Sequence, residues 1–295
     1  MIFPAFDPAR PIAVIGCGVM GAKVAWACAR VGIPTRAFDT SAPQLEVALG
    51  QVHGWSEGAE RQVLASSLSF TSDLDRALDG AQLAFENVPE DLELKQRVHD
   101  EIGQRLSTAA YMGSNTSSLP CSPLADASGR PQRFFNMNFT DPRSQGLVEI
   151  MGGAKTAPET IAFALAWAEA IRMIPILTRV EQMGYSFNRL WRAIKKEVLQ
   201  QWGRGSGHPE DIDRAWMLTF GTPYGPFGLM DQVGLATILK IEERYFEASG
   251  KDDDRPPQKL YDMVRQGRLG VATGEGFYTY PNPAYERPGW LKGGA

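Results

Sequence analysis

The sequence predicts an α/β protein in which a Rossmann-type, doubly wound sheet is followed by an all-α helical domain. Three observations support this class. A glycine-rich loop joins an apolar run to a helical pattern, strand and helix patterns alternate as far as residue 180, and only helical patterns follow. Because 295 residues exceed what one compact core usually holds, we expect two domains, at 1–182 and 183–295.

The glycine-rich loop is the most informative local pattern. It follows the apolar strand at 11–15 and precedes a helical pattern at 22–32. Gly16 permits a tight turn, Gly18 lets the backbone approach a pyrophosphate, and Gly21 lets helix and strand pack closely. The remaining candidate contacts on this loop are Val19 and Met20. A dinucleotide phosphate is therefore expected at the helix N-terminus.

Asp39 ends the next predicted strand, at 35–38. A carboxylate at this distance from the glycine loop accepts hydrogen bonds from the ribose hydroxyls of a dinucleotide. Thr40 and Ser41 follow it, where an arginine would be expected for a 2′-phosphate. The pattern favours NAD over NADP, although Arg36 lies nearby.

The remaining elements follow from periodicity. One or two helices are expected at 43–66. Further strands are predicted at 68–73, 81–88, 109–118, 133–139, 147–151 and 174–178, and helices at 74–80, 89–106 and 158–172. The second domain is predicted to contain helices at 183–203, 209–220, 229–250 and 256–267, with a Pro/Gly-rich surface tail from 280. On the first of these helices, Lys195, Lys196 and Glu197 are expected to form a solvated face.

Composition excludes several classes of function. A net charge of −4 argues against a nucleic-acid binder. No apolar run approaches the roughly 20 residues of a membrane span, and the N-terminus does not resemble a signal peptide. Cys17, Cys28 and Cys121 lack metal-ligand spacing, so no metal site is expected. Free buried thiols in a reducing cytoplasm are the expected state of these cysteines.

Several stretches in order along the chain resemble the NAD-dependent L-3-hydroxyacyl-CoA dehydrogenase family. They include GCGVMG (16–21), SNTSSLP (114–120), RFFNMNFTDP (133–142), GYSFNRL (184–190) and GTPYGPFGLMDQVGL (221–235). The resemblance implies hydride transfer between the nicotinamide of NAD and a hydroxy carbon. It also implies a homodimer formed through the helical domain.

The resemblance also implies roles for individual residues. Glu90 and Lys95 match positions that line the nicotinamide-side channel. Asn115 and Ser117 match the amide and hydroxyl beside the nicotinamide and the substrate oxygen. Two further matches are Glu149, the carboxylate that orients the catalytic histidine, and Asn188, an amide that contacts the substrate carbonyl.

The catalytic histidine itself is missing, because Asn138 occupies its position and an amide cannot accept the hydroxyl proton. His53, His99 and His208 are expected to be surface or capping residues. Residues 43–66 contain one cation, Arg61, whereas relatives that bind coenzyme A use a basic helical segment here. These departures predict a substrate that has diverged from the family norm, such as a hydroxy acid, an acyl thioester or an imine.

Three alternatives remain open at this stage. The chain is an ordinary 3-hydroxyacyl-CoA dehydrogenase in which Glu149 or a water takes the proton, or it is a non-catalytic NAD-binding protein. The third alternative concerns Asp141, which stands where the family has an asparagine. If Asp141 and Glu149 both face the pocket, two carboxylates favour a cationic, nitrogen-bearing substrate; otherwise Asp141 caps the turn before Pro142.

Overall fold

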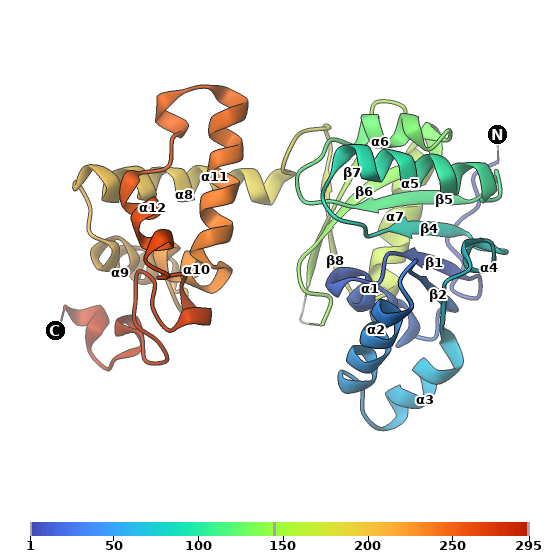
Figure 1. Cartoon of the computed structure of the whole chain (residues 1–295), viewed down its shortest axis with the longest axis horizontal. Helices are drawn as coiled ribbons and strands as arrows, with labels where there is room; N and C mark the ends of the chain where they lie inside the picture. The colour runs from blue at the N-terminus through green and yellow to red at the C-terminus, as the bar shows by residue number, and fades with distance from the viewer. Residues whose placement is uncertain (1, 144–145, 294–295) are drawn as a thin grey trace. The chain divides into compact units, whose positions relative to one another are not determined.

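The computed structural model describes residues 2–143 and 146–293 and divides into two compact units. The first is Met1–Asn188 and the second is Arg189–Ala295 (Figure 1). Their boundary lies six residues beyond the division expected from the sequence. No helix in the described part of the chain is both long and apolar enough to cross a membrane.

The first unit is built on one eight-stranded sheet of order β3-β2-β1-β4-β5-β6-β7-β8. All neighbouring strands are parallel except β6 and β7, which are antiparallel. The strands are β1 (Ile12–Ile15), β2 (Thr35–Phe38), β3 (Leu68–Thr71), β4 (Leu83–Glu86), β5 (Tyr111–Asn115), β6 (Phe134–Phe139), β7 (Leu147–Gly152) and β8 (Ile174–Thr178). The strand order reverses between β1 and β4, where open α/β sheets bind their ligands.

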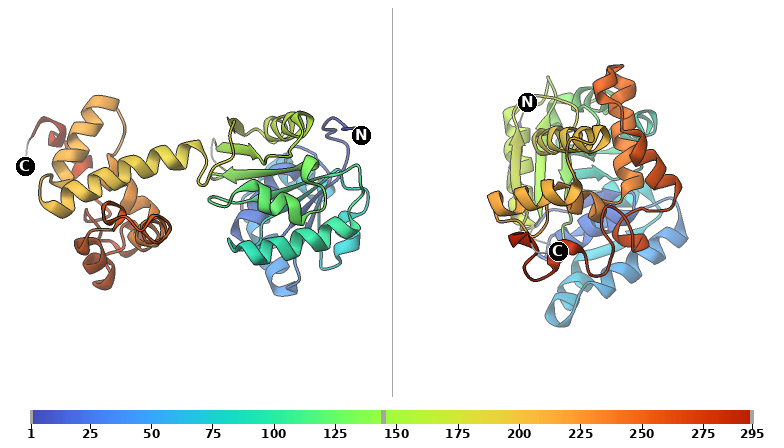
Figure 2. Two further views of the ribbon diagram at one scale, coloured as in Figure 1. Left: turned by 90° about the horizontal axis from the view of Figure 1, so that it is seen from above. Right: turned by 90° about the vertical axis from the view of Figure 1, so that its left-hand side faces the viewer.

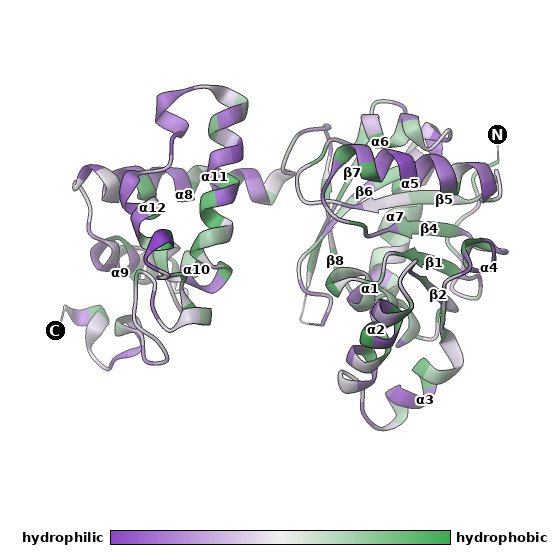
Figure 3. Ribbon diagram, in the orientation of Figure 1, coloured by the Kyte–Doolittle hydropathy of each residue, from purple (hydrophilic) through white to green (hydrophobic). Residues whose placement is uncertain are grey.

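Helices cover both faces of this sheet, as the two views in Figure 2 show. One face packs against α1 (Val19–Ala29), α2 (Ala42–Gly54), α3 (Gly58–Ser67) and α7 (Pro158–Ala170). The other packs against α4 (Leu74–Leu78), α5 (Leu92–Arg105) and α6 (Cys121–Ala127). Alternate strand residues therefore enter different cores, and the central strand β1 is hydrophobic along its length (Figure 3). The prediction of a doubly wound sheet is confirmed.

The sequence pattern predicted most of these elements but not all. Helix α1 begins at Val19, three residues earlier than expected, because the glycine loop runs directly into it. Helix α6 was not predicted, since its seven residues, CSPLADA, are too few to show a clear helical period.

The second unit is helical, as predicted. Helix α8 (Ser186–Arg204) begins in the first unit and continues into the second. The other helices are α9 (Pro209–Phe220), α10 (Pro226–Val233), α11 (Leu235–Ser249) and α12 (Gln258–Arg265). Among the described residues of this unit there is no strand, and only isolated bridges join Gly270, Glu275 and Thr279.

Three expectations for the second unit were wrong. The single helix predicted at 229–250 is two helices, which meet at Gly234, where φ is 95° and the helix cannot continue. The tail is not merely a surface segment, because Tyr285 and Trp290 are buried in the core of the unit, although most of the described residues from 281 on are exposed. Lys195 is not solvated, since it is buried and its Nζ lies 2.8 Å from Oε1 of the equally buried Glu242.

Two buried aspartates connect the helices of this unit to its C-terminal segment. Asp213 accepts hydrogen bonds from the backbone N–H groups of Phe227 (2.9 Å) and Gly228 (2.8 Å) at the start of α10, and from the hydroxyl of Tyr278 (3.0 Å). Asp231 accepts bonds from the N–H groups of residues 277 and 278 and from the hydroxyl of residue 280. We call Asp213 and Asp231 the aspartate pair.

Candidate active site

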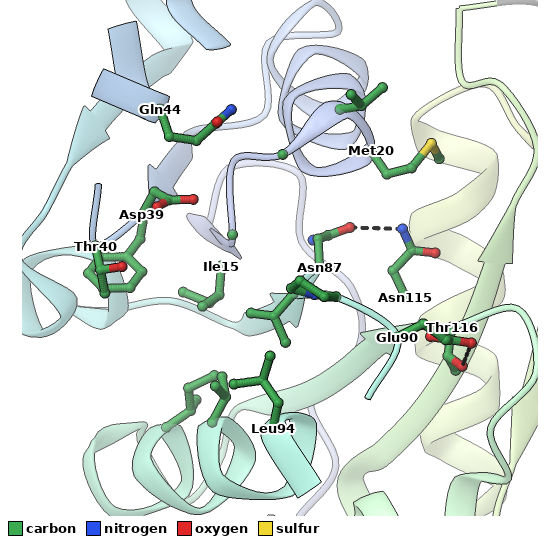
Figure 4. Close-up of a pocket in the computed structure, with 18 of the residues that line it drawn as sticks. Ile15, Met20, Asp39, Thr40, Gln44, Asn87, Glu90, Leu94, Asn115 and Thr116 are labelled. Atoms are coloured by element: carbon green, nitrogen blue, oxygen red, sulfur yellow. Dashed lines mark hydrogen bonds between the residues drawn. The ribbon is translucent and has the colours of Figure 1, made fainter. Parts of the chain in front are cut away.

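A cavity of about 810 Å³ lies in the first unit, where β1 and β4 end and the strand order reverses. Figure 4 shows its two ends: Asp39 and Thr40 lie on one side, and Glu90, Asn115 and Thr116 lie on the other. Three carboxylates, from Asp39, Glu90 and Glu101, are among its described lining residues, and no lysine, arginine or histidine is.

The glycine loop forms the phosphate end of this cavity. Gly18 is the N-cap of α1, no side chain caps the helix, and its first turn contains no acidic residue. A Cβ atom on Gly21 would lie 1.8 Å from the carbonyl oxygen of Gly16, so helix and loop touch only because residue 21 has no side chain. The uncapped N–H groups of the helix are left for an anion, which fits the pyrophosphate of a dinucleotide.

Asp39 is held so that its carboxylate borders the cavity. Its Oδ2 accepts a hydrogen bond from the N–H of Cys17 (2.8 Å), and its Oδ1 accepts one from the N–H of Ser41 (2.9 Å). Arg36 does not oppose it, because the Arg36 guanidinium donates to the backbone carbonyls of Arg76 and Asp79. Among the described lining residues, the ribose end therefore presents a carboxylate and no guanidinium, which fits NAD rather than NADP.

Glu90 organises the opposite end of the cavity. Its Oε1 accepts hydrogen bonds from the hydroxyls of Thr116 (2.7 Å), Ser117 (3.3 Å) and Ser118 (2.9 Å). The same oxygen also accepts bonds from the N–H groups of Ser117 and Ser118, both at 3.0 Å. One carboxylate thus fixes the hydroxyl-rich turn that follows β5. Beside it, Asn115 Nδ2 donates to Asn87 Oδ1 at 3.0 Å (Figure 4).

Beneath this end lies a fully buried group that we call the Glu86 cluster: Glu86, Lys95, His99 and Ser114. Glu86 and Ser114 are partners in the register of β4 and β5, and the Ser114 hydroxyl donates to Glu86 Oε2 at 2.7 Å. Lys95 Nζ donates to Glu86 Oε1 (2.8 Å), and His99 Nε2 lies 3.1 Å from Glu86 Oε2. His99 is therefore not the surface or capping residue that the sequence suggested.

Lys95 connects the Glu86 cluster to the wall of the cavity. Besides Glu86, its ammonium donates to the carbonyl oxygens of Val88 (3.1 Å) and Asn115 (2.8 Å), and it lies 3.9 Å from Glu90 Oε2. Burial alone would raise the pKa of the Glu86 carboxyl, but the nearby His99 ring and the charge of Lys95 outweigh burial and lower that pKa. The buried carboxylate is thus kept ionised.

Asn138 and Glu149 face each other as register partners across β6 and β7. Asn138 Nδ2 donates to Glu149 Oε2 at 3.4 Å. Glu149 Oε1 accepts the N–H groups of Ser186 (3.0 Å) and Phe187 (2.8 Å), so this buried carboxylate caps the N-terminus of α8. Asn188 in the same turn donates from Nδ2 to the carbonyl oxygen of Ser117 at 3.3 Å.

The premise of a two-carboxylate pocket was wrong. Asp141 Oδ2 is paired with Lys23 Nζ at 3.0 Å, and its Oδ1 accepts the N–H of Arg143 at 3.0 Å. Asp141 therefore caps a turn and has its own cation, because the loop after β6 lies against α1. This removes the charge argument for an imine substrate.

The structure brings together most of the predicted site residues. The cavity is lined by Gly16, Gly18, Val19, Met20, Asp39, Glu90, Asn115, Ser117 and Asn138. Gly21, Lys95, Glu149 and Asn188 lie behind or beside these residues and hold them in place. Sequence reasoning missed Glu86 and Asn87, although both lie in the stretch FENVPEDLELK at the end of a predicted strand, where a cofactor crevice is expected.

Two family models together match nearly the whole chain. The model described as 3-hydroxyacyl-CoA dehydrogenase, NAD binding domain, matches residues 11–181, and the one described as its C-terminal domain matches residues 184–280.

The chain belongs to the 3-hydroxyacyl-CoA dehydrogenase family. It is 34% identical to a probable 3-hydroxybutyryl-CoA dehydrogenase of Deinococcus radiodurans, over 90% of this chain and 99% of that protein. It is 29% identical to the 5-formyl-3-hydroxy-2-methylpyridine 4-carboxylate 5-dehydrogenase of Mesorhizobium japonicum, over 92% of this chain and 91% of that protein.

Solved structures of the family have the same fold. A diketoreductase is 29% identical with a TM-score of 0.85, and the match covers 93% of this chain and all of that one. The (S)-3-hydroxybutyryl-CoA dehydrogenase of Ralstonia eutropha is 27% identical with a TM-score of 0.84, covering 92% and 99% of the two chains. As a member of the 3-hydroxyacyl-CoA dehydrogenase family, this chain is an NAD-dependent oxidoreductase.

Proposed function

We propose that this dehydrogenase interconverts the hydroxy group of an acid and the corresponding carbonyl group, and that the acid is not carried by coenzyme A. In this proposal Asp39 and the glycine loop hold NAD, and Ser117, Asn138 and Asn188 receive the reacting end of the substrate. When bound, NAD supplies or accepts the hydride. The observation that carries the proposal is that Asp39, Ser117 and Asn138 all line the same cavity, with Asp39 at one end of it.

The charge around the first unit's α2 and α3 supports a substrate without coenzyme A. Residues 41–67 contain three glutamates and one cation, Arg61. The Arg61 guanidinium donates to the carbonyl oxygens of His53 and Ser56, so it is already engaged with the backbone. A polyphosphate carrier normally meets several cations. The Mesorhizobium relative, which is named for a free carboxylate, shows that the family accommodates such substrates.

A substrate screen tests the proposal. Free (S)-3-hydroxy acids and the matching coenzyme A thioesters should be compared with NAD, following NADH absorbance. We expect a higher kcat/KM for a free acid than for its thioester. A thioester preferred by tenfold or more would instead support an ordinary 3-hydroxyacyl-CoA dehydrogenase.

That second candidate function has its own test. By resemblance Asn138 stands at the histidine position, and Glu149 remains beside it to orient an imidazole. Asn138→His should therefore raise the activity on 3-hydroxyacyl thioesters, because a general base contributes roughly 10²–10⁴ in rate. If Asn138→His brings no gain, the pocket itself no longer accepts thioesters.

We further propose a cytoplasmic homodimer formed through the helical unit. Leu218 and Phe220 near the end of α9 are each 61% exposed, and the rings of Trp216 and Phe220 lie 4.5 Å apart. Such an apolar surface suits a second copy of the chain. Sedimentation at micromolar concentration should give a dimer, and Leu218→Glu with Phe220→Glu should shift it toward monomer; a monomeric unmodified chain would contradict this.

A further inference from the structure

We infer that Glu90, acting through the hydroxyl of Ser117, is the general base that replaces the missing histidine. This inference rests on the proposed function, because it takes Ser117 as the group that meets the substrate oxygen. It assigns a catalytic role to a carboxylate on the wall of the cavity and gives Asn138 a binding role only.

Glu90 lies at the end of the cavity where the substrate is expected. Of the titratable side chains among the described lining residues, Asp39 belongs to the ribose end. Glu101 follows Leu94 by seven residues on α5, or roughly 10 Å along the helix. Glu90 is the carboxylate that shares its end of the cavity with Asn115 and Thr116 (Figure 4). Its side chain is 25% exposed, so a proton that it accepts has a path to water.

A hydrogen bond connects Glu90 to Ser117. The Ser117 hydroxyl donates to Glu90 Oε1 at 3.3 Å, which orients the Ser117 lone pairs away from Glu90. A substrate hydroxyl that donates to Ser117 Oγ is thereby joined to a carboxylate in two steps. In this arrangement Ser117 relays the proton, Glu90 is the base, and a third group supports the base, as acid–base catalysis requires. The supporting group is Lys95, whose Nζ lies 3.9 Å from Glu90 Oε2.

Glu149 is not placed to act as the base. That carboxylate is buried, does not line the cavity, and accepts three hydrogen bonds, two of them from the backbone of α8. Its two oxygens are occupied in holding a helix N-terminus and Asn138. Glu149 also has no link to Ser117 among the hydrogen bonds of the described residues, whereas Glu90 lines the cavity and accepts the Ser117 hydroxyl directly.

Oxidation removes one proton and one hydride from the substrate. The substrate O–H proton passes to Ser117 Oγ while the Ser117 proton passes to Glu90 Oε1. The C–H hydrogen leaves with its electron pair as a hydride to NAD, the oxidant of the established activity. The products are a carbonyl compound, NADH and a neutral Glu90, which then loses its proton to water.

A double-mutant comparison tests the assignment. Glu90→Gln should lower kcat for the substrate found in the screen by about 10²–10⁴ in the unmodified background. In the Asn138→His background it should cost less than tenfold, because the imidazole then accepts the proton. Asn138→His should also add an inflection near pH 6.5 to the profile of kcat/KM. Equal losses in both backgrounds would show that Glu90 only positions the turn and would overturn the inference.

Two controls keep the result unambiguous. Glu93→Gln removes an exposed carboxylate three residues away on α5 and should leave kcat unchanged. The Kd for NAD, measured by quenching of tryptophan fluorescence, should change less than threefold in Glu90→Gln. If Glu90→Gln loses NAD binding, Ser117→Ala is measured in the same two backgrounds instead. A relay through Ser117 predicts a smaller loss of kcat in the Asn138→His background, and equal losses of kcat would refute it. If neither the unmodified chain nor Asn138→His oxidises any substrate in the screen, the result contradicts the proposed function and not the assignment of Glu90.

Discussion

The Glu86 cluster of the first unit and the aspartate pair of the second neutralise their buried carboxylates in different ways. In the first, the Glu86 cluster uses a cation, Lys95, together with a histidine and a serine hydroxyl. In the second, the aspartate pair has only backbone N–H groups and tyrosine hydroxyls as hydrogen-bond partners among the described residues. Dipoles compensate a buried charge less completely than a cation does.

The pKa shifts have opposite signs for this reason. The pKa of Glu86 is lowered despite burial, whereas burial raises the pKa of Asp213 to about 6 in spite of three hydrogen bonds, and the nearby Asp231 adds to the rise. The Glu86 carboxyl beneath the cavity is therefore ionised at neutral pH.

The largest expected effect comes from Glu86→Gln. It leaves the Lys95 ammonium buried without its carboxylate, which costs about 3–5 kcal/mol. Equilibrium unfolding in urea should show this loss. Asp75→Asn, which breaks the exposed pair with Arg105, should cost less than about 1 kcal/mol. A similar small loss for Glu86→Gln would mean that Lys95 finds another partner.

A matched pair of lysines separates stability from function. Lys95→Met and Lys195→Met each break a buried ion pair of 2.8 Å, so both should lower the free energy of unfolding by about 3 kcal/mol. Only Lys95→Met should also weaken NAD binding, by about tenfold or 1.4 kcal/mol, because Lys95 holds the carbonyls of Val88 and Asn115. Fluorescence titration with NAD measures the difference, and equal NAD affinities would refute it.

The Glu86 cluster and the aspartate pair should respond to acid in opposite directions. Because its pKa is raised, the charged Asp213 carboxylate destabilises the folded state above pH 6. This destabilisation disappears as the pH falls toward 4, so the free energy of unfolding should increase by up to about 3 kcal/mol. A lowered pKa means that the contribution of Glu86 is lost as the pH falls below its ordinary value of 4.5. Hydrogen exchange, corrected for chemical rates, should show α10 more protected at pH 5 than at pH 7.5. Asp213→Asn should remove this gain.

The smallest effect is expected from Tyr278→Phe. It removes one hydroxyl donor from Asp213 and should cost about 1 kcal/mol at pH 7.5. Because the carboxylate then loses a partner that favours its charged form, the gain in stability on acidification should increase. Thermal unfolding at the two pH values checks both statements, and an unchanged pH dependence would show that Tyr278 does not stabilise the ionised aspartate.

Local chemistry made parts of this protein predictable. The glycine loop, Asp39 and the alternation of strands and helices depend on backbone conformation and on neighbours within about 20 residues, so their spacing is visible in the sequence. The family motifs then pointed to Ser117, Asn138 and Glu149, which the antiparallel pairing of β6 and β7 and the cap of α8 bring together. The break at Gly234 was missed because helical periods continue on both sides of it.

The sequence by itself determined the fold class, the cofactor and the phosphate and ribose end of the cavity, because these follow from short-range spacing. The resemblance to the family pointed to the residues at the other end. Only the tertiary structure decided which charged groups are buried and which residue each of them contacts. Asp141 meets Lys23, which is 118 residues away, and His99 meets Glu86 from the middle of a helix that looked exposed. Burial and ion pairing depend on which distant segments pack together, so a residue's charge state and its role are fixed only when the chain has folded.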